Sequence, residues 1–94
     1  METMPFVLLN KVQEDLRTGP AHISLMAAIL KLNEEQSKDY SIEVTGRKLR
    51  SVAHIGGKAA YYRYLSDLQR FGYIRYVPFY KHKRVGRIEI LKMK

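Results

Sequence analysis

The segment from Ala21 to about Ser37 is the feature that most constrains the fold of this chain. Its apolar residues recur at helical spacing in two stripes, so the predicted helix is apolar on nearly all sides. One stripe comprises Ile23, Met26, Ala27 and Leu30, and the other comprises Leu25, Ile29 and Leu32. Such a helix must be covered on more than one side, and we predict that it is the central helix of the fold.

Composition fits one small domain. The chain has 94 residues, enough for one domain and too few for two. Hydrophobic residues make up 46% of it, which argues against intrinsic disorder. There is no cysteine, which excludes disulfides and cysteine-containing zinc sites and suits a reducing cytosol. The first residues lack the basic start and apolar run of a signal peptide, and no apolar run approaches the roughly 18–20 residues of a membrane span. We expect a cytoplasmic protein without a membrane partner.

Shorter elements surround the central helix in the sequence. An amphipathic helix is predicted over residues 6–17, with an apolar face that comprises Leu9, Val12 and Leu16. Gly19 is a suitable stop for it, and Pro20 suits the first turn of the central helix. The pattern then predicts, in order, a strand over residues 40–44, a helix over 46–53, a tight turn over 54–56, a helix over 57–71 and a hairpin with strands over 73–77 and 87–91. Thr45 is expected to cap the first of these two helices, and Gly72 to end the second.

The last two predicted helices combine an apolar inner face with a basic outer face. The inner faces comprise Leu49, Val52 and Ala53 on the first helix and Tyr61, Leu65 and Leu68 on the second. The outward residues are Arg47, Lys48 and Arg50 on the first and Lys58, Ala59, Tyr62, Arg63 and Ser66 on the second. Core packing is also expected for Tyr64, Tyr73 and Tyr76, whereas Phe79 and Tyr80 fall in the open hairpin loop.

Charge is divided very unevenly along the chain. Residues 1–46 carry four Lys or Arg and seven Asp or Glu, a net charge of −3. Residues 47–94 carry 13 Lys or Arg against Asp67 and Glu89, a net charge of +11. A surface that serves solubility alone mixes both signs, so this asymmetry predicts a polyanionic partner for the C-terminal half.

A helix-turn-helix followed by a hairpin is suited to duplex DNA. The major groove, about 12 Å wide, admits one helix, while the preceding helix crosses the backbone. The hairpin then reaches a phosphate backbone or the minor groove. Candidate DNA-binding residues occur in all three places: Arg47, Lys48 and Arg50 on the first helix, Lys58, Ala59, Tyr62 and Arg63 on the second, and Lys81, Lys83, Arg84 and Arg87 on the hairpin. Phosphate contacts are the better expectation for Lys58 and Arg63, because most protein–DNA hydrogen bonds go to phosphate and sugar. Arg75 and Arg87 are expected opposite each other on the outer hairpin face, where a polyanion would relieve their repulsion.

Residues 55–65 (IGGKAAYYRYL) and 68–74 (LQRFGYI) resemble the recognition-helix segment of winged-helix proteins, many of which end that helix in a Leu-x-x-x-Gly-Tyr/Leu-Ile pattern. From His22-Ile23-Ser24-Leu25 onward, the chain is similar to small winged-helix proteins of bacterial mobile elements, especially conjugative transposons. The resemblance covers about Pro20 to Ile90. It implies an α+β winged helix-turn-helix with residues 20–94 as its core, residues 1–19 as an extra N-terminal helix and a C-terminal β-hairpin wing. It also implies a nucleoid-associated role in gene regulation, excision or replication of an element.

The leading interpretation is therefore a double-stranded DNA-binding transcriptional regulator, or an excision or architectural factor of a mobile element. One alternative is the origin-binding module of a replication initiator. Another, from a different class, is a protein-interaction module that docks an acidic partner. A homodimer is also open, because the central helix and the extra first helix could support one, and any exposed part of their apolar surface would need covering.

No catalytic or metal-binding pattern emerges. His22, His54 and His82 fall on different predicted elements, with no carboxylate or cysteine at ligand spacing. Gly57-Lys58 fails the phosphate-loop pattern, because Val52 stands at the position of its first glycine and Ala59 at that of its hydroxyl residue. We expect no enzyme activity, no cofactor, no metal and no small-molecule ligand.

Overall fold

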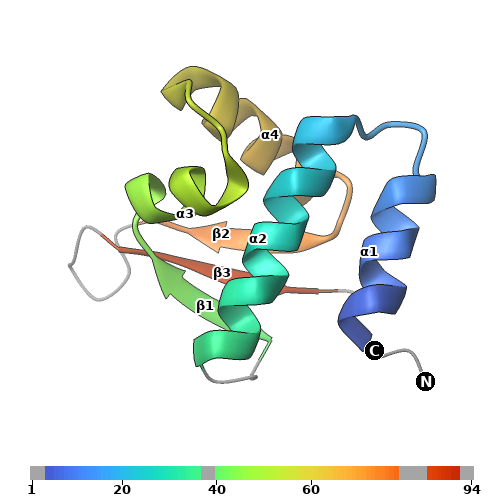
Figure 1. Cartoon of the computed structure of the whole chain (residues 1–94), viewed down its shortest axis with the longest axis horizontal. Helices are drawn as coiled ribbons and strands as arrows, with labels where there is room; N and C mark the ends of the chain where they lie inside the picture. Colours follow the sequence, from blue (N-terminus) through green and yellow to red (C-terminus); the bar gives the residue numbers. More distant parts are fainter. Residues whose placement is uncertain (1–3, 37–39, 79–84, 92–94) are drawn as a thin grey trace.

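The computed structural model describes residues 4–36, 40–78 and 85–91. For residues 4–6 it describes the backbone but not the side chains. These residues form a small α+β domain with four helices and a three-stranded antiparallel sheet (Figure 1). In chain order the elements are α1 (Met4–Glu14), α2 (Pro20–Gln36), β1 (Ser41–Val44), α3 (Gly46–Ala53), α4 (Lys58–Arg70), β2 (Ile74–Val77) and β3 (Gly86–Ile90). Within the described part of the chain, no helix is long and apolar enough to cross a membrane.

Helix α2 is the central helix, as the sequence predicts. It contacts α1, α3, α4 and β1, and Figure 1 shows it crossing in front of the sheet with α1 on one side and α3 on the other. Leu25, Met26 and Ile29 are completely buried. None of the large apolar side chains that the described residues expose lies on α2. The chain itself thus covers the apolar surface of α2, one of the two helices on which the expectation of a homodimer depended.

The sheet has the order β1-β3-β2, so β3 is its middle strand. Ile42 pairs with Ile88, and Ile74 pairs with Ile90. These four side chains are buried on the face that the helices cover. Because side chains alternate along a strand, the residues between them lie on the opposite face of the sheet. The predicted hairpin is confirmed, with β2 and β3 as its strands.

Local signals set the bounds of several elements correctly. Helix α2 begins at Pro20, and Thr45 caps α3 by accepting a hydrogen bond from the backbone N–H of Lys48 at 3.1 Å. Gly72 follows α4 with a φ of 86°, a left-handed conformation that favours glycine. His54 ends α3 in the same region with a φ of 59°, which produces the predicted turn between α3 and α4.

The end of α1 differs from the prediction. The helix stops at Glu14, and Leu16, which was expected on the buried face, is fully exposed. The Thr18 hydroxyl donates to the carbonyl oxygens of Val12 and Asp15, at 2.6 and 2.8 Å, and so satisfies acceptors that a further helical turn would have used. The buried positions of α1 are Leu8 and Val12, one turn nearer the N-terminus.

Candidate nucleic-acid interface

The first residue of α3, Gly46, lies beside two tyrosines of α4. A Cβ atom built on Gly46 would lie 3.6 Å from the ring of Tyr61 and 3.8 Å from the hydroxyl oxygen of Tyr62. An added Cβ atom would thus make ordinary van der Waals contact with both tyrosines. The inner faces are as predicted: Leu49 and Ala53 of α3 and Tyr61, Leu65 and Leu68 of α4 are buried, and Val52 packs against the same core.

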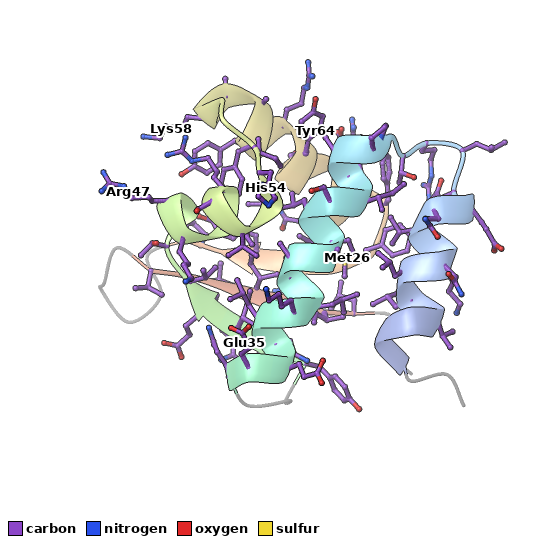
Figure 2. The ribbon with its side chains drawn as sticks, in the orientation of Figure 1. Met26, Glu35, Arg47, His54, Lys58 and Tyr64 are labelled. Carbon is purple, nitrogen blue, oxygen red and sulfur yellow. The ribbon has the colours of Figure 1, made fainter. Side chains whose placement is uncertain are left out.

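The opposite face of α4 is uncovered. All five side chains predicted to point outward are exposed, namely Lys58, Ala59, Tyr62, Arg63 and Ser66. Arg47 and Lys48 of α3 are exposed as well, and Figure 2 shows Arg47 and Lys58 projecting from the same side of the molecule. The structure therefore brings the predicted residues of α3 and α4 onto one surface, which we call the α3–α4 surface.

Arg50 is the exception among these basic residues. It is half-buried, and its guanidinium donates a hydrogen bond to the carbonyl oxygen of Gly56 at 3.3 Å. That carbonyl belongs to the turn between the two helices. Arg50 therefore braces the turn, in addition to contributing positive charge.

The α3–α4 surface is strongly positive. The two helices carry six basic residues and one acidic residue, Asp67. The Asp67 carboxylate is occupied by two partners, since Oδ2 lies 2.9 Å from His22 Nε2 and Oδ1 accepts from the Arg70 guanidinium. It lies toward α2 and away from α3. No acidic side chain of α3 or α4 thus offsets the charge of Arg47, Lys48, Lys58 and Arg63.

Of the four hairpin residues predicted to bind DNA, the structure describes Arg87. Lys81, Lys83 and Arg84 lie outside the described residues. Arg87 lies on the sheet face away from the helices, because its neighbours Gly86 and Ile88 are buried on the helix-covered face. The structure therefore does not place Arg87 on the α3–α4 surface.

The expected juxtaposition of Arg75 and Arg87 is wrong. Arg75 pairs across the sheet with Glu89, and Arg87 pairs with Val77. The Glu89 carboxylate forms ion pairs with both arginines, at 3.8 Å from Arg75 Nη1 and 3.3 Å from Arg87 Nε. The carboxylate between the two guanidinium groups offsets part of their repulsion, so this pair provides no separate argument for a polyanion.

Sequence reasoning missed the pair of His22 and Asp67. The two residues are 45 positions apart, and nothing local in the sequence indicates that they meet. The backbone N–H of Gly19 donates to His22 Nδ1 at 2.9 Å, so His22 Nε2 carries the hydrogen that it donates to Asp67. The imidazole also meets the ring of Tyr64 edge to face, with centroids 5.0 Å apart. His22 thus fixes the position of α4 on the start of α2.

A metal-binding role for His22 finds no support in the geometry. Both ring nitrogens are already engaged. Among the described residues, no group of three or more histidine or acidic side chains could hold a metal ion.

Two carboxylates make the stability of the fold depend on pH in the acid range. The hydrogen bond with His22, aided by Arg70, holds the pKa of Asp67 below its usual value, and hydrogen bonds from Arg17 lower the pKa of Asp15. Each group therefore binds a proton more weakly in the folded than in the unfolded chain. Their stabilising effect is present above the unfolded pKa of about 4 and is lost as pH falls through the folded pKa.

We predict that the free energy of unfolding falls steadily from pH 5 to pH 2.5, and that Asp67→Asn makes this fall smaller. Urea unfolding at a series of pH values measures both effects. The control is Glu35→Gln, which changes an exposed carboxylate of α2. Its free energy of unfolding should vary with pH as that of the wild type does. A pH dependence that Asp67→Asn leaves unchanged would contradict the role given to the His22–Asp67 pair.

Three tyrosines meet beside the start of α3. The rings of Tyr61 and Tyr62 are in edge-to-face contact, with centroids 5.0 Å apart. The ring of Tyr76 from β2 covers Gly86, where an added Cβ atom would lie 2.5 Å from it. Burial raises the pKa of Tyr61 and of Tyr76, with smaller contributions from neighbouring tyrosines. These phenols therefore remain neutral at physiological pH.

Comparison with known proteins identifies no relative: no family model, no curated protein and no solved structure matches the chain. The chemistry that this surface can perform follows from its own geometry and charge. It offers a helix with one uncovered face, four exposed cationic side chains and an exposed tyrosine. Such a surface is suited to binding a polyanion.

Proposed function

We propose that the chain is a duplex DNA-binding protein of the winged-helix type. In this proposal α4 enters the major groove, α3 crosses the adjacent backbone, and the β2–β3 hairpin is the wing. The observation that carries it is the uncovered face of α4, because that face combines exposed cations with small side chains and has exposed cations of α3 beside it.

The dimensions of α4 suit the groove. A helix with its side chains is about 10–12 Å across, and the major groove of B-DNA is about 12 Å wide. The 13 residues of α4 are held from behind by α2 and β2, so the helix can present its free side without losing its support. Ala59 and Ser66 on this side are short enough to allow close approach to base edges.

The charge of the α3–α4 surface suits the DNA backbone. Arg47, Lys48, Lys58 and Arg63 are exposed cations on this surface, and each can neutralise one phosphate. Neutralising a phosphate releases condensed counterions, so affinity falls as salt rises. An acidic protein partner carries less regular charge and offers no groove for α4, which is why duplex DNA is the favoured partner.

The proposal is tested by titrating the wild-type protein with a fluorescent duplex at several salt concentrations. We expect a plot of log K against log salt with a slope of about −4, since each neutralised phosphate contributes about −0.9. Polyglutamate of similar charge is the comparison partner and should bind more weakly. Absence of duplex binding, or equal affinity for polyglutamate, would overturn the proposal.

A finer proposal follows from the resemblance of residues 20–90 to winged-helix proteins of mobile elements. We infer that the protein acts on the DNA of such an element, as a transcriptional regulator or an excision or architectural factor. Selection of bound sequences from a random duplex pool tests this inference, since a regulator should select a defined site. A palindromic consensus would indicate a two-fold symmetric dimer on DNA, because half-site spacing mirrors protein symmetry.

A further inference from the structure

Tyr62 is exposed, but its ring packs against a buried neighbour. The exposed fraction of the residue is 44%, whereas that of its edge-to-face partner Tyr61 is 2%. Its hydroxyl oxygen lies 3.8 Å from the Cβ position of Gly46, so the side chain reaches from α4 to the first residue of α3. The ring contact with Tyr61 restricts the Tyr62 side chain, so this side chain loses less conformational entropy when it binds a partner.

The position of Tyr62 on α4 directs it to one flank of the helix. It lies one turn after Lys58 and two turns before Gln69, on the same side of the helix. That flank faces β2, because the side-chain oxygen of Gln69 accepts a hydrogen bond from the backbone N–H of Tyr76 at 3.0 Å. The outermost line of α4, farthest from the core, instead carries Ala59, Arg63, Ser66 and Arg70 at helical spacing.

The opposite flank carries a second phosphate-directed group. Tyr64 and Asp67 lie there, against His22 of α2. The guanidinium of Arg63 is turned toward this flank, 5.2 Å from the ring centre of Tyr64, and its Nη2 donates to the Tyr64 hydroxyl at 3.3 Å. Tyr62 and Arg63 are thus adjacent in sequence but directed to opposite sides of the helix.

A helix in the major groove presents its outermost line to the base edges and its two flanks to the two phosphate backbones. We propose that Tyr62 is a backbone-phosphate contact at the junction of α3 and α4. Its hydroxyl donates a hydrogen bond to the phosphate that Arg47, the residue after Gly46, neutralises. This inference rests on the proposed duplex binding and names the part of the duplex that Tyr62 recognises, which is the backbone rather than a base.

A neutral donor leaves a characteristic signature. A hydroxyl adds a hydrogen bond to a charged acceptor but releases no counterion, so it raises affinity without steepening the salt dependence. A base contact would instead change the preference among duplex sequences. These two readouts separate a phosphate contact by Tyr62 from base recognition.

The test compares Tyr62→Phe, which removes only the hydroxyl, with Arg47→Ala and with Tyr40→Phe, which alters an exposed tyrosine just before β1. Affinities for an A·T-rich and a G·C-rich duplex are measured at several salt concentrations. We expect Tyr62→Phe to weaken binding to both duplexes by about tenfold with an unchanged salt slope. Arg47→Ala should reduce the magnitude of the slope by about 0.9. Tyr40→Phe should bind like the wild type.

Wild-type affinity in Tyr62→Phe, or a loss confined to one duplex, would overturn the phosphate contact while leaving duplex binding intact. Failure of the wild type to bind either duplex would overturn the proposed function and this inference together. Thermal unfolding of each variant accompanies the titrations. A midpoint within about 2 °C of the wild type is expected for Tyr62→Phe, because its ring and packing are kept.

Discussion

Replacing Lys58 and Arg63 together by alanine should weaken duplex DNA binding by about 100-fold at physiological salt. Hydrogen bonds to charged groups contribute about 1.5–3 kcal/mol each, so the loss of two cation–phosphate contacts reaches this magnitude. The salt slope should become shallower by about 1.8, since two phosphates are no longer neutralised. Fluorescence anisotropy titrations at several salt concentrations measure both quantities.

A matched control separates position from net charge. Lys11→Ala/Lys31→Ala removes two exposed cations from α1 and α2 and lowers the net charge by the same amount. We expect this variant to bind duplex DNA within about threefold of the wild type, because long-range steering is strongly screened beyond the Debye length of about 8 Å. Equal losses in the two double variants would indicate non-specific attraction and would contradict a defined α4 interface. Both variants change exposed side chains, and stability should stay within about 0.5 kcal/mol of the wild type.

Elements whose boundaries depend on local chemistry were predictable from the sequence. Helix α3 occupies the predicted residues 46–53 because the Thr45 side chain caps its first turn and the apolar spacing fixes its buried face. Helix α4 was predicted one residue too long at each end, since Gly57 acts as its N-cap and Phe71 as its C-cap. The uncovered face of α4 followed correctly from the same spacing. In these segments local preference and tertiary packing agree, which is the condition for reading structure from sequence.

Features that depend on distant pairs were not predictable. The strand register that places Arg75 opposite Glu89 is fixed by how β3 sits between β1 and β2, and alternation alone allows several registers. The contact of His22 with Asp67 joins α2 to α4, and the spacing of residues in the sequence does not indicate it. The Tyr62 hydroxyl likewise lies near Gly46, a residue of a different helix, and spacing along the sequence does not indicate this proximity. The exposed residues of α3 and α4 were therefore predictable as a set, but the contacts that each of them makes required the structure.

Leu16 illustrates the limit of periodicity within a single helix. It follows Val12 by four residues, which is helical spacing, so the sequence assigns Leu16 to one apolar stripe with Leu9 and Val12. Arg17, however, donates to the Asp15 carboxylate from its backbone N–H at 3.0 Å and from Nε at 2.9 Å, which turns the chain. Tyr73 also donates to this carboxylate at 2.8 Å and anchors the turn to the end of α4. A local ion pair thus overrides the apolar pattern.

Leu68→Ala should cause the largest loss of stability, about 3–4 kcal/mol, whereas Leu16→Ala should change stability by less than about 0.5 kcal/mol. Leu68 of α4 is completely buried, so its removal leaves a cavity behind the proposed recognition helix, while Leu16 is fully exposed. A domain of this size is stable by about 5–14 kcal/mol, so the first loss is a large share of the total. Thermal unfolding should register it as a decrease of about 15–25 °C in Tm.

Urea unfolding of the two variants provides a matched comparison, because each makes the same chemical change from leucine to alanine. A loss above about 2 kcal/mol for Leu16→Ala would restore the longer first helix that the sequence predicts. A loss below about 1 kcal/mol for Leu68→Ala would mean that α4 is not anchored as described. At temperatures where Leu68→Ala remains folded, its duplex affinity should approach that of the wild type, since no exposed residue of the α3–α4 surface is altered. Leu68→Ala should therefore lose stability but keep DNA binding. Lys58→Ala/Arg63→Ala should lose DNA binding but keep stability.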